Sequence, residues 1–412
     1  MIEFNRFELS NGLRIIHQYD PSVSTVVLNT LYNVGARDES PDRTGFAHLF
    51  EHLMFAGSKN VASFDKEIEQ AGGQNNAFTN NEFTNYYISV PAENIETAFW
   101  LESDRMLALN INENSLNIQK GVVIEEFKQR CFNAPFGLLW HHVRDMLYKE
   151  SPYRWPTIGL TFDHISDAKL SDVQGFYQRF YSPNNAVVSI VGNLTLKDCE
   201  THAQKWFGDI PVTAEANKNV YPKDENWSPT RRVEEDLSPN PVVFLVWKGP
   251  DIHQEDSLAL ELYSDVLGGS EVSELYEALV KNEGLCNAAE CFYMRGLGEG
   301  LFMAYGILNE GVSQETVENR LFEIIEESFL KPDSFAFESA KNKNYTHLLF
   351  DPINPMSRAQ KLAFWEHLGM PDMINNEASK IKDLELKSVF QTAQKYFTRE
   401  SASVLFYNPK NT

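Results

Sequence analysis

The stretch Ile165-Ser-Asp-Ala-Lys-Leu-Ser-Asp-Val173 has a counterpart 216 residues further along the chain, Ile381-Lys-Asp-Leu-Glu-Leu-Lys-Ser-Val389. Ile, Asp, Leu and Val occupy the same four positions in both stretches. The same offset aligns apolar positions elsewhere: Val26-Val27-Leu28 with Val242-Val243-Phe244, Phe180-Tyr181 with Tyr396-Phe397, and Ala186 and Val188 with Ala402 and Val404. A constant offset over most of a chain indicates an internal duplication. We therefore predict two homologous domains, residues 1–217 and 218–412, joined by a Pro-, Asn-, Lys- and Glu-rich linker near residues 211–230.

Each half follows one coarse order of elements: strand, helix, strand, helices, strand. In the first half, apolar β-branched runs predict strands and helical spacing predicts helices; the strands are expected at 24–34, 86–90 and 186–191, and the helices at 44–56, 94–109, 113–130 and 170–181. Asp42 or Thr44 is the expected cap of the first helix. No glycine-rich phosphate loop follows a strand, which argues against a doubly wound nucleotide-binding fold. The predicted fold class is α+β: two homologous α/β-sandwich domains, each a mainly antiparallel sheet packed with helices.

The charge balance excludes some partners. The chain has 36 Lys and Arg against 58 Asp and Glu, a net charge of −22, and nucleic acids and anionic membranes both bind basic surfaces. No apolar run approaches the ~18 residues of a membrane span. Four scattered cysteines without a CxxC pair predict reduced thiols. Residues 1–8 lack an apolar signal core. We expect no nucleic acid or membrane partner and a cytoplasmic protein, or a periplasmic one if a native signal was removed.

The segment His48-Leu-Phe-Glu51-His52 lies inside the predicted helix 44–56. Residues four apart share one face of a helix, so the two imidazoles are placed to bind one metal ion. Glu51 precedes His52 and is within reach of a metal-bound water without being a ligand. Zinc lowers the pKa of such a water from about 15.7 to about 7, and a carboxylate then accepts its proton. The pattern predicts a hydrolytic zinc site with His48 and His52 as ligands and Glu51 as general base.

A catalytic zinc ion normally has three protein ligands and one open position. Two adjacent acids, Glu125 and Glu126, lie among apolar residues of the predicted helix 113–130, where a carboxylate is costly unless it is paired or bound to a metal. Helical phase does not separate the two, so both are candidates on this ground. The remaining histidines are interpreted as core or surface residues, and the neighbours His141 and His142 point to different helix faces, which makes a poor chelate.

The inverted HxxEH order, an acid about seventy residues later and two related halves resemble the pitrilysin (M16) family of zinc peptidases, in its short-chain group similar to mitochondrial processing peptidase and its bacterial relatives. In Gly121-Val-Val-Ile-Glu-Glu126 the resemblance implies that the second acid, Glu126, is the third ligand. It implies that Asn76-Ala77-Phe78-Thr79 is the edge strand that pairs with the substrate backbone. The implied cofactor is Zn²⁺, and the implied activity is endoproteolysis of short or unfolded peptides.

Two departures from the family pattern lie in the second half. Relatives often carry an Arg and a Tyr, seven apart around Gly-Leu, that bind the substrate carbonyl and the developing oxyanion. Here Val280 and Asn287 occupy those positions around Gly284-Leu285. The second domain also has no metal site, because the 216-residue offset leads from the HxxEH residues to Ser264, Leu267 and Gly268. In the first half, Gln119 replaces an acid that many relatives keep.

These departures define the expected partner. We expect a catalytic subunit in a heterodimer with a homologous chain that lacks HxxEH and supplies the Arg and Tyr. A self-sufficient homodimer would need other donors, such as Asn287 or Tyr293. The alternative is a non-catalytic structural or peptide-binding subunit that keeps the metal motif as a remnant. The intact HxxEH motif with Glu126 favours the enzyme.

Overall fold

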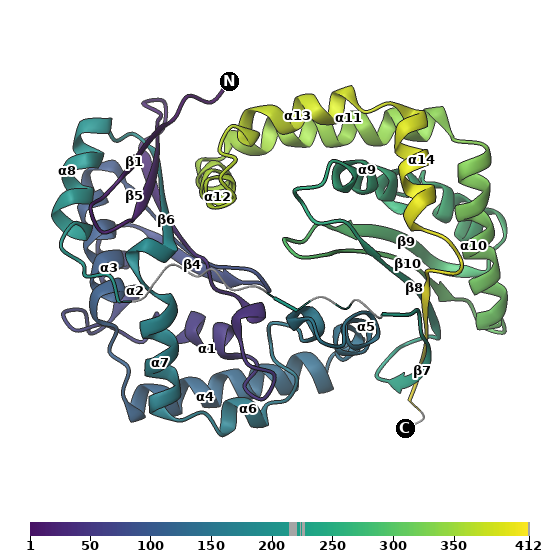
Figure 1. Ribbon diagram of the computed structural model, residues 1–412, viewed down its shortest axis with the longest axis horizontal. Helices are drawn as coiled ribbons and strands as arrows, with labels where there is room; N and C mark the ends of the chain where they lie inside the picture. Colours follow the sequence, from purple (N-terminus) through teal and green to yellow (C-terminus); the bar gives the residue numbers. More distant parts are fainter. Residues whose placement is uncertain (214–220, 223, 225–226, 411–412) are drawn as a thin grey trace. The chain divides into compact units, whose positions relative to one another are not determined.

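The computed structural model describes residues 1–213, 221–222, 224 and 227–410 (Figure 1). These residues form two compact units, each built from several segments. Unit 1 contains Met1–Phe127, Trp155–Pro222 and Leu349–Asn376, and unit 2 contains Lys128–Arg154, Lys223–Leu348 and Glu377–Thr412. The predicted domain boundary between residues 217 and 218 lies outside the described residues.

Unit 1 is organised around a six-stranded mixed sheet with the order β1-β2-β6-β3-β5-β4. Its strands are β1 Asn5–Glu8, β2 Arg14–Tyr19, β3 Thr25–Tyr32, β4 Gln74–Thr79, β5 Thr84–Pro91 and β6 Ala186–Gly192. The pair β2–β6 is parallel and the other pairs are antiparallel. All seven residues of β6 are buried, as expected for a central strand covered on both faces. Strand β4 pairs only with β5 and therefore forms one edge of the sheet.

Helices cover both faces of this sheet. They are α1 Phe46–Leu53, α2 Phe64–Gln70, α3 Ile95–Ala108, α4 Glu113–Phe127, α6 Asp163–Ser166, α7 Leu170–Phe180, α8 Leu196–Phe207 and α12 Pro355–His367. The main core packs Phe50, Phe99 and Phe180 against Leu28 and Ile88 of the sheet. On the opposite face α12 packs against β6 and β3.

Unit 2 contains a five-stranded sheet with the order β7-β11-β8-β10-β9. The strands are β7 Arg231–Asp236, β8 Val242–Gly249, β9 Cys286–Met294, β10 Gly300–Leu308 and β11 Ser403–Pro409, and the helices are α5 Leu139–Leu147, α9 Asp256–Gly268, α10 Gln314–Leu330 and α14 Leu386–Tyr396. Two further helices, α11 Ser334–Phe350 and α13 Met373–Asp383, contain residues of both units. Side chains of α9, α10 and α14 form the main core of this sheet.

The two sheets confirm the predicted fold class and the duplication. Adding 216 to the strand positions of unit 1 turns the order β2-β6-β3-β5-β4 into β7-β11-β8-β10-β9, and the pair β7–β11 is parallel like β2–β6. Helix α7 maps onto α14 with the same offset, as the repeated stretch predicts.

The compact units differ from two contiguous halves in one reciprocal way. Helix α12, from the second half of the sequence, covers the sheet of unit 1, and α5, from the first half, covers the sheet of unit 2. The offset of 216 relates the start of α5 at Leu139 to the start of α12 at Pro355. Each sheet thus buries its second face with a helix from the other half, because an apolar sheet face must be covered.

The predicted strands and helices of the first half all occur, with ends shifted by a few residues, and residues 113–130 continue from α4 into a π-helical turn at Lys128–Phe132. All four cysteines are buried free thiols, as predicted. No helix in the described part of the chain is long and apolar enough to cross a bilayer. The compartment stays a prediction.

Candidate metal centre

Helix α1 is about two turns long and carries the HxxEH motif, and its apolar side is buried. Phe46, Leu49, Phe50 and Leu53 point into the main core of unit 1. The opposite side carries Glu51 and His52, which are half-buried, and His48, which is buried but for a small fraction. Core packing on one side therefore holds the polar side in one orientation.

The start of α1 is capped by a residue that sequence reasoning missed. Gly45 has φ = 89° and no side-chain cap. Instead Glu39 accepts hydrogen bonds from the N–H groups of Gly45 (Oε2, 2.9 Å) and Ala47 (Oε1, 2.8 Å). Glu39 is buried, and burial raises its pKa well above the ordinary carboxyl value despite these two hydrogen bonds. A carboxyl group six residues upstream of Gly45 thus satisfies two backbone N–H donors at the start of the helix that carries the HxxEH motif.

The expected cap, Asp42 or Thr44, was wrong. The Thr44 hydroxyl accepts a hydrogen bond from the N–H of Leu160 at 2.8 Å and lies 2.8 Å from Nδ1 of His164. Thr44 therefore ties the start of α1 to the segment 160–164 and does not cap the helix. The signal for Glu39 was weak, because an acid outside the helix becomes a cap only when a loop folds it back.

The three predicted ligands lie together. Glu126 Oε2 is 3.3 Å from His52 Nε2 and 3.6 Å from His48 Nε2, and one ligand atom from each residue lies within 4.8 Å of the other two. Four ligands at about 2.0–2.2 Å in a tetrahedron are about 3.3–3.6 Å apart, so these separations fit a zinc-sized ion. No other such group of His, Cys, Asp or Glu occurs in the described part of the chain.

The structure distinguishes the two adjacent acids of α4, Glu125 and Glu126. Glu126 is half-buried and turned toward α1, whereas Glu125 is exposed. Helices α1 and α4 pack against each other, with Leu116 and Val123 of α4 in the main core. The spatial neighbour of the HxxEH helix is therefore the face of α4 that carries Glu126.

Two buried tyrosines, Tyr86 and Tyr181, lie near Glu51, the predicted general base. Burial mainly raises the pKa of Tyr86 and Tyr181, and the negative charge of Glu51 raises both further. The two hydroxyls are 3.4 Å apart, and the ring of Tyr181 stacks on Phe50 of α1. The buried Arg105 guanidinium lies 4.4 Å above the ring of Tyr86. The two phenols near Glu51 come from β5 and from the residue after α7, so the sequence around Glu51 does not reveal them.

The predicted substrate segment, residues 76–79, belongs to β4 and is an edge strand, as the resemblance implied. Helix α1 packs beside this strand. Asn76 and Phe78 point away from the main core, while Ala77 packs against it. The N–H of Ala77 donates to the side chain of Asn76 at 2.8 Å, so this edge group has a local acceptor in place of a neighbouring strand.

The remaining positions considered in the sequence lie in unit 2. Ser264, Leu267 and Gly268 are buried in α9. Val280 packs against the core of unit 2 and Asn287 is exposed on β9. His142 lies 3.4 Å from Glu234.

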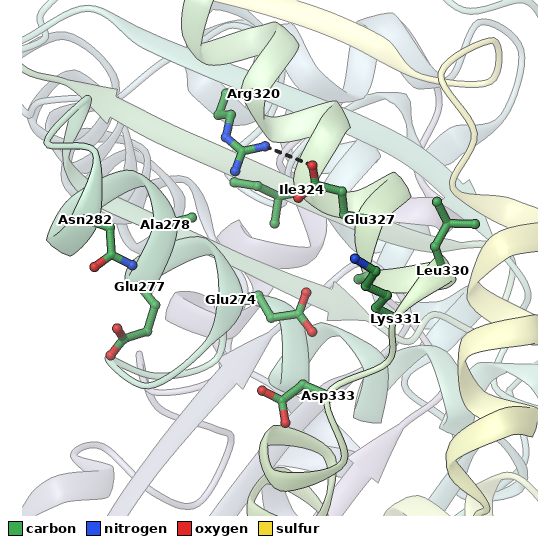
Figure 2. Close-up of a pocket in the computed structure, with 11 residues that line it drawn as sticks. Glu274, Glu277, Ala278, Asn282, Arg320, Ile324, Glu327, Leu330, Lys331 and Asp333 are labelled. Atoms are coloured by element: carbon green, nitrogen blue, oxygen red, sulfur yellow. Dashed lines mark hydrogen bonds and ion pairs between the residues drawn. The ribbon is translucent and has the colours of Figure 1, made fainter.

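Unit 2 contains a pocket of about 460 Å³, and none of the described residues that line it is a histidine. Figure 2 shows Glu274 inside it, with Glu327 and Asp333 nearby. Oε1 of Glu274 is buried without a hydrogen-bond partner in the described residues. Burial, with added repulsion from Asp333 and Glu327, raises the pKa of Glu274 to about 7.

Family comparisons agree with this geometry. The model described as "Insulinase (Peptidase family M16)" matches residues 14–153, and the model described as "Peptidase M16 inactive domain" matches residues 167–344. The chain belongs to peptidase family M16. All four residues of the candidate centre, His48, Glu51, His52 and Glu126, fall inside the first match.

Relatives within family M16 cover almost the whole chain. "Zinc protease PqqE" of Helicobacter pylori is 27% identical over 411 residues, which are 97% of this chain and 92% of the relative. The "Probable mitochondrial-processing peptidase subunit beta" of Arabidopsis thaliana is 22% identical over 420 residues, 97% of this chain and 77% of the relative. The crystal structure of a protease from Helicobacter pylori has a TM-score of 0.92 at 24% identity and covers 99% of this chain and 100% of its own. The predicted resemblance is thereby confirmed.

Proposed function

We propose that this M16 chain is the catalytic subunit of a zinc-dependent endopeptidase that hydrolyses short or unfolded peptides. The observation that carries the proposal is the convergence of His48, His52 and Glu126 from two helices, with Glu51 on the same face of α1. The donor set, two imidazoles and one carboxylate, is one that catalytic zinc takes in proteins. Relatives named zinc proteases add support.

The roles of the side chains follow from this arrangement. His48, His52 and Glu126 would hold the metal. Zinc, when bound, supplies an acidified water and polarisation of the scissile carbonyl. Glu51 accepts the proton of that water and later delivers it to the leaving amine nitrogen. Glu51 is half-buried on α1, the helix that also carries both histidine ligands.

The edge strand would hold the substrate. A peptide that extends the sheet at β4 gains main-chain hydrogen bonds and lies beside α1. Residues 76–79 are then the substrate-binding segment. A peptide carbonyl would replace Asn76 as the acceptor of the Ala77 N–H.

A second chain completes the proposal. Val280 and Asn287 offer neither the guanidinium nor the phenol that the family resemblance implies for the oxyanion, and removal of one such donor costs about 10²–10³ in kcat. We therefore propose a heterodimer with a homologous subunit that lacks HxxEH and supplies both groups. The same two positions also fit the second candidate, a peptide-binding subunit without activity.

The test compares zinc content with turnover. The purified chain is loaded with Zn²⁺, the bound metal is counted by mass spectrometry, and hydrolysis of quenched fluorescent unstructured peptides is measured with and without a partner subunit. One zinc per chain together with partner-dependent hydrolysis supports the proposal. One zinc with peptide binding but no hydrolysis under either condition favours the second candidate, and absence of stoichiometric zinc removes the catalytic role.

A further inference from the structure

Unit 1 contains a small polar pocket on the face of the sheet opposite the metal centre. Its volume is about 340 Å³, near the lower limit of ligand sites (about 300–1,000 Å³), which suits a side chain better than a whole peptide. Strands β3, β4 and β5 form its floor, and the start of α12 closes one side. The polar residues that line it are Thr25, Gln74, Asn75, Asn76, Tyr87, Ser89 and Asn354.

This pocket combines hydrogen-bonding groups with an absence of charge. Among the described residues that line it, none is acidic or basic, although the chain as a whole carries a net charge of −22. The side chains of Thr25, Gln74, Tyr87 and Ser89 make no hydrogen bond within the described residues. The oxygen of Asn354 already accepts from the N–H of Met356 and caps α12. Three hydroxyls and one amide are therefore available to a ligand.

The pocket lies where a bound peptide would direct alternate side chains. Gln74 and Asn76 line it from β4, opposite Ser89 and Tyr87 of β5, whereas Ala77 packs on the other face with the main core. Side chains alternate between the two faces of a sheet, and an added strand continues that alternation. Every second side chain of a peptide paired with β4 would thus lie on the face of the pocket.

We propose that this pocket is a specificity subsite for an uncharged hydrogen-bonding side chain of the peptide, Asn, Gln, Ser or Thr. The inference rests on the proposed pairing of substrate with β4. A lysine, arginine, aspartate or glutamate side chain would lose part of its hydration without meeting a counter-ion. A large apolar side chain would leave the free hydroxyls of Ser89 and Tyr87 without partners.

The experiment introduces a negative charge at one residue that lines the pocket. Gln74→Glu keeps the shape of an exposed side chain of β4 and adds a carboxylate. The control Gln70→Glu adds the same charge at the exposed end of α2, outside the pocket. The zinc-loaded full chain carrying Glu51→Gln is incubated with a positional-scanning library of unstructured peptides, and retained peptides are sequenced by mass spectrometry. The same library is also digested by the chains in which Glu51 is intact. The partner subunit is added where one has been obtained.

The expected result is one peptide position that prefers Asn, Gln, Ser or Thr and shifts toward Lys or Arg by about tenfold with Gln74→Glu, but not with Gln70→Glu. A preference that Gln74→Glu leaves unchanged would overturn the subsite while the peptidase proposal stands. A wild-type preference for charged or large apolar residues at the responsive position would also overturn it. If zinc binds but no peptide is retained or cleaved, the peptide-binding proposal and the subsite fail together.

Discussion

His52 Nε2 and Glu126 Oε2 lie 3.3 Å apart, although 74 positions separate the two residues in the sequence. This relationship joins α1 to α4 and brings a carboxylate beside the two imidazoles of the HxxEH motif, which completes the candidate metal site. His48 lies on the same side of Glu126, at 3.6 Å. The position of Glu126 decides whether the centre has a third ligand.

Replacement of Glu126 therefore tests the ligand set directly. Glu126→Gln should lower zinc affinity by at least about 100-fold, since loss of an outer partner of a metal ligand alone costs 10–100-fold. Glu125→Gln is the matched control, because that acid is adjacent in sequence but exposed. Competition with a chromogenic chelator measures both affinities. Equal affinities for the two variants would remove Glu126 from the ligand set.

Glu51 should be required for turnover and dispensable for metal binding. Glu51→Gln keeps the size of the side chain but cannot take a proton, and loss of a general base typically costs about 10²–10⁴ in rate. Zinc stoichiometry should stay at the level of the parent chain. Residual hydrolysis above a tenth of the parent rate would assign the base to another group.

Glu39 should be needed to hold the metal-binding helix. Glu39→Ala leaves the N–H groups of Gly45 and Ala47 buried without their acceptors, which should cost about 2 kcal/mol of unfolding free energy and weaken zinc binding. Glu39→Gln keeps one acceptor oxygen and should lose less on both measures. Denaturant unfolding and zinc titration check this, with the exposed Glu69→Ala as control. A Glu39→Ala variant with parental zinc affinity would limit Glu39 to a general structural role.

The isolated chain should be a poor peptidase. Without Arg and Tyr at positions 280 and 287, it should hydrolyse unstructured peptides at least about 100-fold more slowly than in the presence of the partner subunit. Steady-state kinetics, together with size-exclusion chromatography of the mixed subunits, measures this. Full activity from the purified chain alone would contradict the heterodimer.

Glu274 should make stability depend on pH. Its pKa is raised to about 7 in the folded chain, from 4.5 for an ordinary glutamate, so the folded state holds a proton that the unfolded state has released. The associated stability is fully present below about pH 4.5 and is lost as the pH rises through 7. Gln at position 274 stays neutral at every pH. At pH 8 the Glu274→Gln variant should therefore have a higher unfolding temperature than the parent, with a free energy of unfolding larger by up to about 3 kcal/mol. At pH 4.5 the two unfolding temperatures should be similar.

Thermal unfolding at the two pH values tests this prediction. Glu310→Gln, on an exposed turn, removes one acid without affecting a buried group and is the control. A difference between parent and Glu274→Gln that does not change with pH would show that Glu274 is ionised in the same way in both states.

The sequence alone determined the local and repetitive features of this protein. The offset of 216 residues predicted two sheets of one topology, because apolar alternation and helical spacing are properties of neighbouring residues. The HxxEH spacing predicted that His48 and His52 share a helix face for the same reason. Residues 76–79 were recognised as an edge strand through a family resemblance and not through physics.

Tertiary structure decided what depends on distant segments. Helical phase within 113–130 could not choose between Glu125 and Glu126, because the choice depends on which face of α4 packs against α1. The cap at Glu39 depends on a loop that folds back over the start of α1, and the exchange of α5 and α12 depends on which sheet face needs cover. The polar pocket beside β4 combines residues 25 and 89, which the pairing of β3 with β5 brings together, with residue 354, which the packing of α12 on the sheet adds.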